Sequence, residues 1–272
     1  MRQAEVFPTY REMVKNLTSV YNDFKKSYAL DSLELLCSAR GYFPDSPQVK
    51  LAEEMNIGFL SVADDETYKD KAENLALYSK NNYFILNNRF IIPVYGVNGD
   101  LVSLIGYFPD DRKYITLPTP FFSKECMFFN FKQAYELSYS DYDGLVFLVE
   151  GIFDCLSLRS IGLPCIATMG STVSKLKCEL LKMFKKVIAI PDNDKTGRLA
   201  LNRYDKRGWV VPPNATMLRF KGGELDLESP TGPVIVKCKD VDDLVLWYDS
   251  DSVRDILLSY RNSTEDIADL IL

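Results

Sequence analysis

The sequence predicts an α/β fold in the second half of the chain, with a mostly parallel sheet flanked by helices. A part made of helices and a β-hairpin precedes it, so the chain as a whole is expected to be α+β. Residues 144–250 alternate apolar runs with helical stretches, which is the pattern of a doubly wound sheet. Residues 1–130 instead begin with helical periodicity and change near residue 83 to strands and turns. With 272 residues, of which 47% are apolar, the chain is long enough for a core and two compact units.

The first 80 residues have a polar, helical pattern. Four apolar residues recur there at helical spacing and predict one buried stripe: Met13, Leu17, Val20 and Phe24. Three further helices and one strand are expected: helices from Asp31 or Ser32 to before Gly41, from Ser46-Pro47 to near Asn56 and over 64–80, and a strand over 57–60. This part therefore predicts a mainly helical beginning of the first unit.

Residues 83–130 predict antiparallel strands. Apolar runs over 90–95 and 101–108 flank the turn residues Asn98-Gly99, which is the signature of a β-hairpin. A third strand is expected at 113–115, before the prolines at 118 and 120. We expect this hairpin region and the preceding helices to form one subdomain, residues 1–140.

The second half predicts alternating strands and helices. The expected strands are 145–149, 164–168, 187–190, 215–220 and 234–236, and the expected helices are 152–160, 172–184 and 196–205. A Gly/Pro/acidic loop is expected over 221–233, and one or two short helices over 249–272. The second predicted domain therefore comprises residues 141–250, and a short helical tail, residues 251–272, follows it.

Acidic residues follow three of the predicted strands. They are Glu150 after the first, Asp192 and Asp194 after the third, and Asp240 and Asp242 after the last. The carboxyl ends of parallel strands meet at one edge of a sheet, so we expect these side chains in one crevice. Their mutual repulsion raises their pKa values, and a bound divalent cation relieves it. All-oxygen ligands favour Mg²⁺ or Mn²⁺. Asp154 lies in the first turn of the helix after Glu150, where negative charge suits the helix dipole.

Composition excludes several classes of protein. A net charge of −6 and a pI near 5.0 argue against a generally basic nucleic-acid coat, although a local groove can still be basic. No apolar run approaches ~20 residues and no signal peptide is recognisable, which predicts a cytoplasmic protein without a membrane partner. The six scattered cysteines and the absence of histidine predict no zinc site and no Ser-His or Cys-His nucleophile.

Two expected helices carry clusters of basic residues. The cluster on the first helix and its flank comprises Lys175, Lys177, Lys182, Lys185 and Lys186; the second comprises Lys195, Arg198, Arg203, Lys206 and Arg207. Such clusters attract a phosphate backbone. They are equally typical of a solvated helical face, so both interpretations stay open.

The acidic motifs Glu150-Gly151-Ile152-Phe153-Asp154, Asp192-x-Asp194 and Asp240-x-Asp242 resemble those of the TOPRIM domain in bacterial-type (DnaG-type) primases. TOPRIM also occurs in topoisomerases and some nucleases. The preceding segment, with Arg89, then Lys113-Tyr114-Ile115, then Lys124, resembles the segment before TOPRIM in these primases, in the same order. The likeness covers about residues 35–245.

The resemblance implies a primase catalytic core that makes short RNA primers on single-stranded DNA from nucleoside triphosphates. It implies metal binding by Asp192, Asp194, Asp240 and Asp242, and catalytic roles for Glu150 and Asp154. Nucleotide or template contacts are expected from Arg89, Lys113, Tyr114, Lys124 and Lys239.

The chain also departs from the family pattern. No cysteine or histidine set can build the zinc-binding domain of these primases, and the chain stops soon after TOPRIM. We expect a phage or plasmid protein, acting in the host cytoplasm if viral, that relies on a separate replicative helicase or template-recognition subunit. A TOPRIM nuclease and a non-catalytic subunit that binds single strands are the alternatives.

Overall fold

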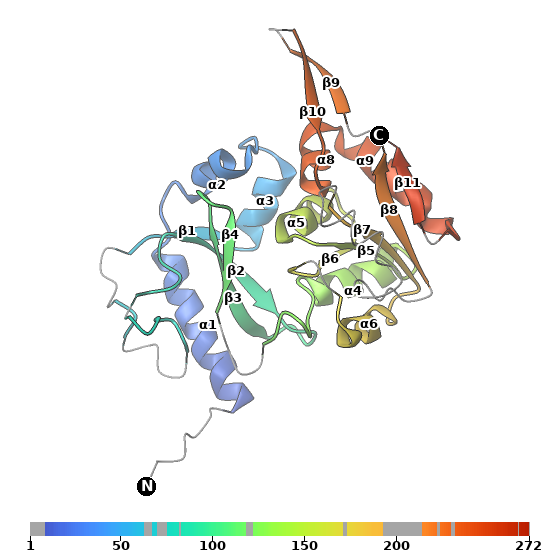
Figure 1. Ribbon diagram of the computed structural model, residues 1–272. Coiled ribbons are helices and arrows are strands. Elements are labelled where there is room, and N and C mark those ends of the chain that lie inside the picture. Colours follow the sequence, from blue (N-terminus) through green and yellow to red (C-terminus); the bar gives the residue numbers. More distant parts are fainter. Residues whose placement is uncertain are drawn as a thin grey trace. The chain divides into compact units, whose positions relative to one another are not determined.

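The structure is a computed structural model that describes residues 9–62, 67–69, 75–81, 83–117, 122–170, 173–192, 214–221, 224–229, 232–265 and 267–271. The chain divides into two compact units, Met1–Ser123 and Lys124–Leu272, called unit 1 and unit 2 below (Figure 1). The sequence prediction placed the boundary after residue 140. Residues 124–140, including most of helix α4 (Phe131–Asp141), belong instead to unit 2.

Unit 1 contains the three helices expected near the N-terminus: α1 (Tyr10–Lys26), α2 (Ser32–Arg40) and α3 (Pro47–Glu54). A capping box between Thr9 and Glu12 starts α1, because each side chain accepts a hydrogen bond from the other's backbone. Gly41 ends α2 with a left-handed φ of 76°, a conformation that glycine adopts without strain. The predicted helix limits are thus confirmed in this region.

The strands of unit 1 form a four-stranded antiparallel sheet in the order β1 (Gly58–Leu60), β2 (Arg89–Tyr95), β3 (Leu101–Phe108) and β4 (Lys113–Thr116). The turn between β2 and β3 contains Asn98-Gly99, as predicted, and Gly99 has a left-handed φ of 87°. The hairpin and the third strand at 113–116 are confirmed.

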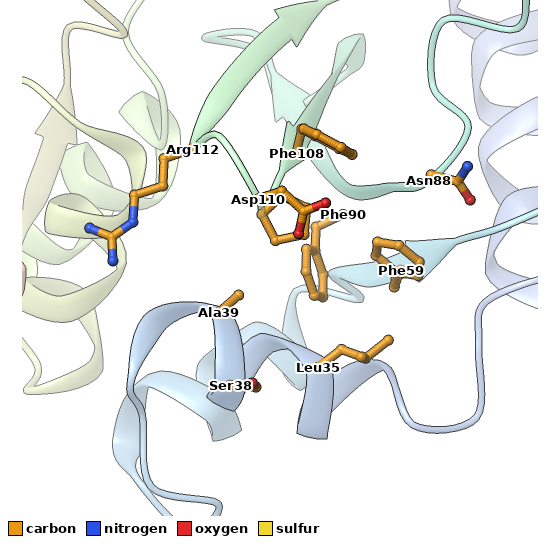
Figure 2. Close-up of a pocket in the computed structure, with 10 residues that line it drawn as sticks. Leu35, Ser38, Ala39, Phe59, Asn88, Phe90, Phe108, Asp110 and Arg112 are labelled. Atoms are coloured by element: carbon orange, nitrogen blue, oxygen red, sulfur yellow. The ribbon is translucent and has the colours of Figure 1, made fainter.

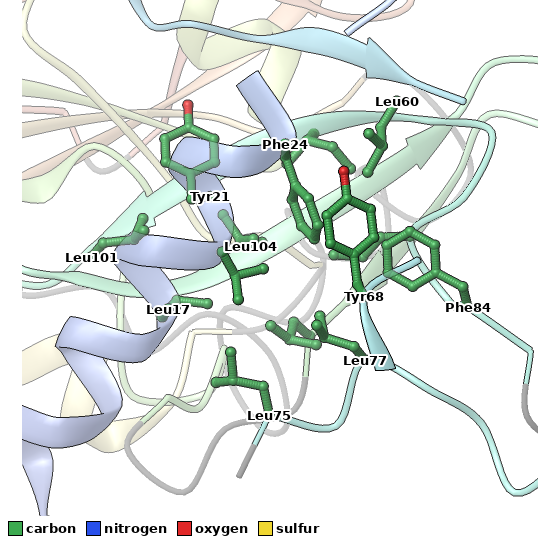
Figure 3. Packing of buried hydrophobic residues seen from close by; sticks show 14 of the residues in the cluster. Leu17, Tyr21, Phe24, Leu60, Tyr68, Leu75, Leu77, Phe84, Leu101 and Leu104 are labelled. Carbon is green, nitrogen blue, oxygen red and sulfur yellow. The ribbon is translucent and has the colours of Figure 1, made fainter. Parts of the chain in front are cut away.

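Helix α1 packs against this sheet through its predicted apolar stripe. Met13, Leu17, Val20 and Phe24 are all buried. Figure 3 shows Leu17 and Phe24 in this core. The predicted helix over 64–80 is wrong for 75–80, where Tyr78 forms an antiparallel bridge with Phe84. Leu75 and Leu77 are both buried in the same core, and this alternate burial suits an extended segment better than a helix.

Unit 2 is built on a five-stranded sheet in the order β11-β8-β7-β5-β6, in which every pairing is parallel. Its strands are β5 (Leu145–Val149), β6 (Cys165–Ala167), β7 (Lys186–Ile190), β8 (Ala215–Lys221) and β11 (Ile267–Ile271). Beside α4, its helices are α5 (Ile152–Ser160), α6 (Lys175–Leu181), α8 (Val241–Trp247), α9 (Ser250–Ser259) and the 3₁₀ turn η2 (Tyr260–Asn262). The predicted parallel sheet flanked by helices is confirmed.

Three predictions near the C-terminus are wrong. The expected loop over 221–233 contains most of a hairpin, β9 (Glu224–Ser229) and β10 (Gly232–Lys237), which forms its own two-stranded antiparallel sheet (Figure 1). The strand expected at 234–236 is therefore part of β10 and not of the parallel sheet. The expected helical tail over 251–272 ends in strand β11, which completes the edge of the sheet beside β8.

The expected helix over 196–205 lies outside the described residues. No helix in the described part of the chain is long and apolar enough to cross a membrane.

Candidate active site

The carboxyl ends of β5 and β7 bring two of the predicted acids to one edge of the parallel sheet. Val149 pairs with Ile190 at the last register position of these neighbouring strands. Glu150 follows directly after β5, and Asp192 is the second residue after β7. This is the edge at which open parallel sheets bind ligands. The prediction that these strand ends share one edge is confirmed by the register.

Asp154 and Asp242 link helices α5 and α8. The backbone N–H of Asp242 donates to Oδ1 of Asp154 at 3.0 Å, and the hydroxyl of Ser157 donates to Oδ1 of Asp242 at 2.5 Å. Asp154 is 6% exposed and Asp242 is 4% exposed. The sequence analysis did not identify Ser157 as a site residue. The available signal was its position three residues after Asp154, which puts both side chains on one face of α5. This buried contact fixes where α8 begins.

Asp240 reaches the site as the N-cap of α8, and not from the end of a parallel strand as predicted. Its side chain accepts from the backbone N–H of Asp243 at 2.9 Å, and Asp243 in turn accepts from the N–H of Lys239 at 2.9 Å. A carboxylate at this position satisfies an otherwise unpaired helical N–H and suits the helix dipole. The capping contacts hold Asp240 close to the α5–α8 link.

The acids act on one another electrostatically. Burial, and then the negative charges of Asp240, Asp192 and Asp242, raise the pKa of Asp154 well above its usual range. The hydrogen bond from the backbone N–H of Asp242 acts in the opposite direction. The charges of Asp192, Asp240 and Asp242 therefore all act on Asp154, in one region of unit 2.

Gly151 is required by this arrangement for a steric reason. It is the N-cap of α5, and a Cβ built on it would overlap the Oδ2 atom of Asp154. Any larger residue there would push the Asp154 carboxylate out of its place. The glycine that follows Glu150 is thus explained by the Asp154 side chain, three residues after Gly151.

The donor chemistry of the acids fits a hard divalent cation, because every candidate ligand atom is a carboxylate oxygen. Within the residues that the structure describes, no three acidic or cysteine side chains are grouped closely enough to hold an ion by themselves. Asp194, the fourth predicted ligand, lies outside those residues. Asp192 and Asp240 lie near enough to Asp154 to raise its pKa.

Glu150 is held by the turn that follows β6. Its side chain is buried, at 9% exposed. Its backbone carbonyl accepts from the N–H of Met169 at 3.1 Å and from the hydroxyl of Thr168 at 3.4 Å. Met169 has a left-handed φ of 57°, which is unusual for a residue other than glycine. The position of Glu150 therefore depends on a strained turn.

The predicted nucleotide-binding residues are distributed over both units. In unit 1, Lys113 is exposed and pairs with Asp111 at 2.7 Å, and Tyr114 is 44% exposed at the neighbouring position of β4. Lys124 and Lys239 are exposed residues of unit 2. These four positions are accessible to a ligand.

Arg89 differs from the other basic candidates because its guanidinium group already interacts with other residues of unit 1. The Nε atom donates to the carbonyl of Ile85 at 3.0 Å, and the guanidinium carbon lies 5.1 Å from the centroid of the Phe108 ring. A guanidinium over an aromatic face is an attractive arrangement. Arg89 thus supports the aromatic surface next to it.

Unit 1 also contains a cavity of about 730 Å³ between α2 and the sheet (Figure 2). Its aromatic lining comes from Phe59, Phe90 and Phe108, and its polar lining includes Asn88, Asp110 and Arg112. Sequence reasoning missed this site. The available signal was the pairing of aromatic residues across successive strands, such as Phe59 opposite Phe90.

Comparisons with known proteins agree with this geometry. Residues 147–209 match the family model described as Toprim-like. The chain is 28% identical over 200 residues to a DNA primase of Thermotoga maritima, covering 70% of this chain and 34% of that protein. It is 30% identical over 201 residues to a DNA primase of Aquifex aeolicus, covering 71% of this chain and 38% of that protein. The chain thus spans about a third of the length of these relatives.

Solved structures show the same fold. The RNA polymerase domain of the primase DnaG from Mycobacterium tuberculosis superposes with a TM-score of 0.68 at 17% identity, covering 91% of this chain and 82% of that one. A DnaG primase catalytic domain bound to single-stranded DNA gives a TM-score of 0.65 at 18% identity, covering 92% of this chain and 80% of that one. The chain is therefore similar in sequence to bacterial DNA primases, matches the Toprim-like family over residues 147–209, and has the fold of the DnaG primase catalytic core.

Proposed function

We propose that this chain is the catalytic core of a DNA primase, which joins ribonucleotides into a short primer on a single-stranded DNA template. The observation that carries the proposal is the accumulation of acidic side chains within unit 2, where Asp240, Asp192 and Asp242 raise the pKa of Asp154. The relatives with similar sequences are DNA primases. Fold alone does not establish activity, so the acids and their surroundings support the proposal most directly.

We propose Mg²⁺ or Mn²⁺ as the cofactor and expect no zinc, because the candidate ligands are carboxylates and the chain has no histidine. Asp192, Asp194 and Asp240 are the proposed principal ligands. Asp242 is the fourth candidate, and one of its oxygens already accepts from Ser157. When bound, the cation would neutralise the triphosphate and stabilise charge on the attacking and leaving oxygens.

Glu150 is the proposed acceptor of the proton from the attacking 3′-hydroxyl group, or else completes the metal site. The oxygen of that hydroxyl bonds to the α-phosphorus of the incoming nucleoside triphosphate, and pyrophosphate leaves. Burial of Glu150 at a strand end keeps its carboxylate at a fixed position, which proton transfer requires. Asp154 acts through its neighbours: it binds the backbone N–H of Asp242 and so sets the start of α8 and the place of Asp240.

The basic residues are proposed to bind phosphates. Lys113, Lys124 and Lys239 are exposed, and each can donate charge-assisted hydrogen bonds to the triphosphate or the template. Arg89 contributes less directly, because its guanidinium lies against Phe108. Tyr114 is the proposed stacking residue for a base, since its ring is 44% exposed.

The aromatic cavity of unit 1 is the proposed contact for an unstacked template base. Phe59 and Phe108 are partly exposed, and Asn88 and Asp110 offer hydrogen-bonding groups that suit base edges. Proteins bind single strands by stacking bases on aromatic rings. The related catalytic domain solved with single-stranded DNA supports a single-stranded ligand for this fold.

Partners and location follow from the proposed reaction. We propose that a separate replicative helicase and a template-recognition subunit deliver the single strand, and that the protein acts in the cytoplasm, where the template is made. The phage or plasmid origin stays a prediction.

Primer synthesis tests the proposal. The protein is incubated with single-stranded DNA, labelled ATP, the other ribonucleotides and Mg²⁺, and the products are separated on a sequencing gel. We expect oligoribonucleotides from the wild type and none from Asp192→Ala. The matched control is Asp255→Ala, which removes an exposed acid of α9 in the same unit and should leave synthesis unchanged.

Other products would indicate a different function. Shortened DNA without new RNA would identify a nuclease. If neither product forms, even after a replicative helicase and a template-recognition subunit are added, the chain is a binding subunit and the primase proposal is wrong.

A further inference from the structure

Lys177 on α6 is the one buried basic side chain among the residues whose exposure the structure describes, with 1% of its surface exposed. The sequence grouped it with Lys175 and Lys182 on a basic helix face. The structure separates them, because those two lysines are not buried. Lysine is almost never fully buried without a partner, since burial of its charge is costly.

The ammonium group of Lys177 has two partners. Its Nζ atom donates a hydrogen bond to the backbone carbonyl of Thr168 at 2.5 Å. The same atom lies 5.2 Å from the centroid of the buried Phe128 ring. Burial lowers the pKa of Lys177 to about 8, so the group is mostly protonated at neutral pH. Lys177 therefore connects α6 to the residues that follow β6.

The N-terminus of α6 is tied down independently of that ammonium group. Ser174 is the N-cap: its hydroxyl accepts from the backbone N–H of Lys177 at 3.2 Å and donates to the carbonyl of Glu125. The backbone of Lys177 is therefore fixed. Its long side chain has a defined starting point from which to reach Thr168.

Lys177 binds the turn over residues 168–170, which lies beside Glu150 and contains a strained residue, Met169. The N–H of Thr168 donates to the carbonyl of Val149 at 2.9 Å, and the next N–H, of Met169, donates to the carbonyl of Glu150 at 3.1 Å. Met169 has a φ of 57°, a left-handed conformation that is strained for a residue other than glycine. Such a turn persists only where surrounding contacts favour it.

We propose that Lys177 is a positioning residue for Glu150: it holds the turn over residues 168–170, and the turn fixes the backbone that carries the Glu150 carboxylate. This rests on the proposed function for the role of Glu150 in catalysis. The structural part, that Lys177 holds the turn, does not depend on any activity.

The test compares Lys177→Met with Lys175→Met, which removes an exposed lysine from the same helix. Hydrogen exchange is measured at the Met169 amide in both variants. We expect exchange about 10-fold faster in Lys177→Met and unchanged in Lys175→Met, because only the first change removes the donor to Thr168. In primer synthesis we expect kcat to fall about 10-fold with KM for the nucleotides changed less than about 2-fold.

A second substitution separates positioning from general damage to the fold. Met169→Gly lets the turn adopt its left-handed φ without strain. Combined with Lys177→Met, it should recover most of the lost kcat and slow the exchange again. A variant that was merely unfolded would not be restored by a glycine. Lys177→Gln, which keeps a neutral donor, should fall between wild type and Lys177→Met.

Unchanged exchange at Met169 in a folded Lys177→Met protein would overturn the proposal, as would faster exchange with an unaltered kcat. If the wild type makes no primer, the primase proposal fails separately. Exchange and Mn²⁺ affinity then decide the role of Lys177: an affinity about 10-fold weaker in Lys177→Met than in Lys175→Met supports it, and equal affinities overturn it.

Discussion

The two units bury different kinds of side chain. In the described part of unit 1 the buried residues are apolar, aromatic or uncharged polar, such as Gln48 and Ser103. In unit 2 the core also contains Glu150, Asp154, Asp242 and Lys177. Burial of charge costs stability unless it is compensated, and perturbed carboxylates cluster at functional sites. The contrast favours the proposal that unit 2 holds the reacting groups and that unit 1 contributes binding surface.

The largest effect should come from Glu150, which tests whether unit 2 holds the reacting groups. Glu150→Gln keeps the size of the side chain and removes its charge. We expect primer synthesis to fall by roughly 1000-fold with no loss of folding, because proton transfer or metal binding is lost. Single-turnover kinetics measure the chemical step. An activity within about 3-fold of the wild type would remove Glu150 from the mechanism.

A smaller effect is expected in unit 1 from Lys113→Ala. Loss of one charge-assisted phosphate contact should raise KM for nucleoside triphosphates about 10-fold to 100-fold. Steady-state kinetics with varied ATP give the value. Lys26→Ala is the matched control, since it removes another exposed lysine of unit 1 that pairs with an aspartate, Asp23. Equal KM values for both variants would mean that β4 does not bind the triphosphate.

The aromatic cavity predicts a moderate effect on template binding. Phe108→Ala removes one aromatic ring from the cavity lining and also the ring against which the Arg89 guanidinium lies. One stack of a base on an aromatic ring is worth about 1–3 kcal/mol. We expect single-stranded DNA to bind about 10-fold more weakly, measured by fluorescence anisotropy at fixed salt. Phe43→Ala serves as the control, because Phe43 is 65% exposed and does not line the cavity. Equal affinities would show that the cavity has another use.

The smallest effect concerns stability. The folded-state pKa of Asp154 is raised, so the folded protein holds that proton more strongly than the unfolded chain does. Stability from this group is greatest at low pH and is lost as pH rises from the unfolded value toward the folded one. Asp154→Asn should therefore increase Tm by a few degrees at pH 7 in EDTA, and by less near pH 4.

Thermal unfolding at both pH values, with Asp255→Asn as control, checks the role of Asp154. A decrease of Tm at pH 7 would mean that the charged carboxylate stabilises the fold, which is the opposite of the expected effect.

Local features of the fold were predictable because they depend on residues close together in the chain. The stripe of α1, the hairpin at Asn98-Gly99 and helix α5 follow from short-range periodicity and turn chemistry. Glu150 and Asp192 were predictable for the same reason, because each follows an apolar run that forms a parallel strand.

Features that depend on distant partners were not predictable. Strand β11 exists because β8 offers an edge, and the pairing of β9 with β10 turned an expected loop into a hairpin. Asp240 follows a hairpin strand and is placed by capping α8. Lys177 cannot be told from Lys175 by sequence, because only tertiary packing buries one and exposes the other.

Titration with Mn²⁺ tests most directly whether the acids of unit 2 form a metal site, since it needs neither template nor partner subunit. Binding is followed by electron paramagnetic resonance for the wild type, Asp192→Asn, Asp240→Asn and the control Asp255→Asn. We predict that wild type and control bind Mn²⁺ with equal affinity, and that both site variants bind at least about 10-fold more weakly. Equal affinity in all four proteins would contradict the proposed metal site.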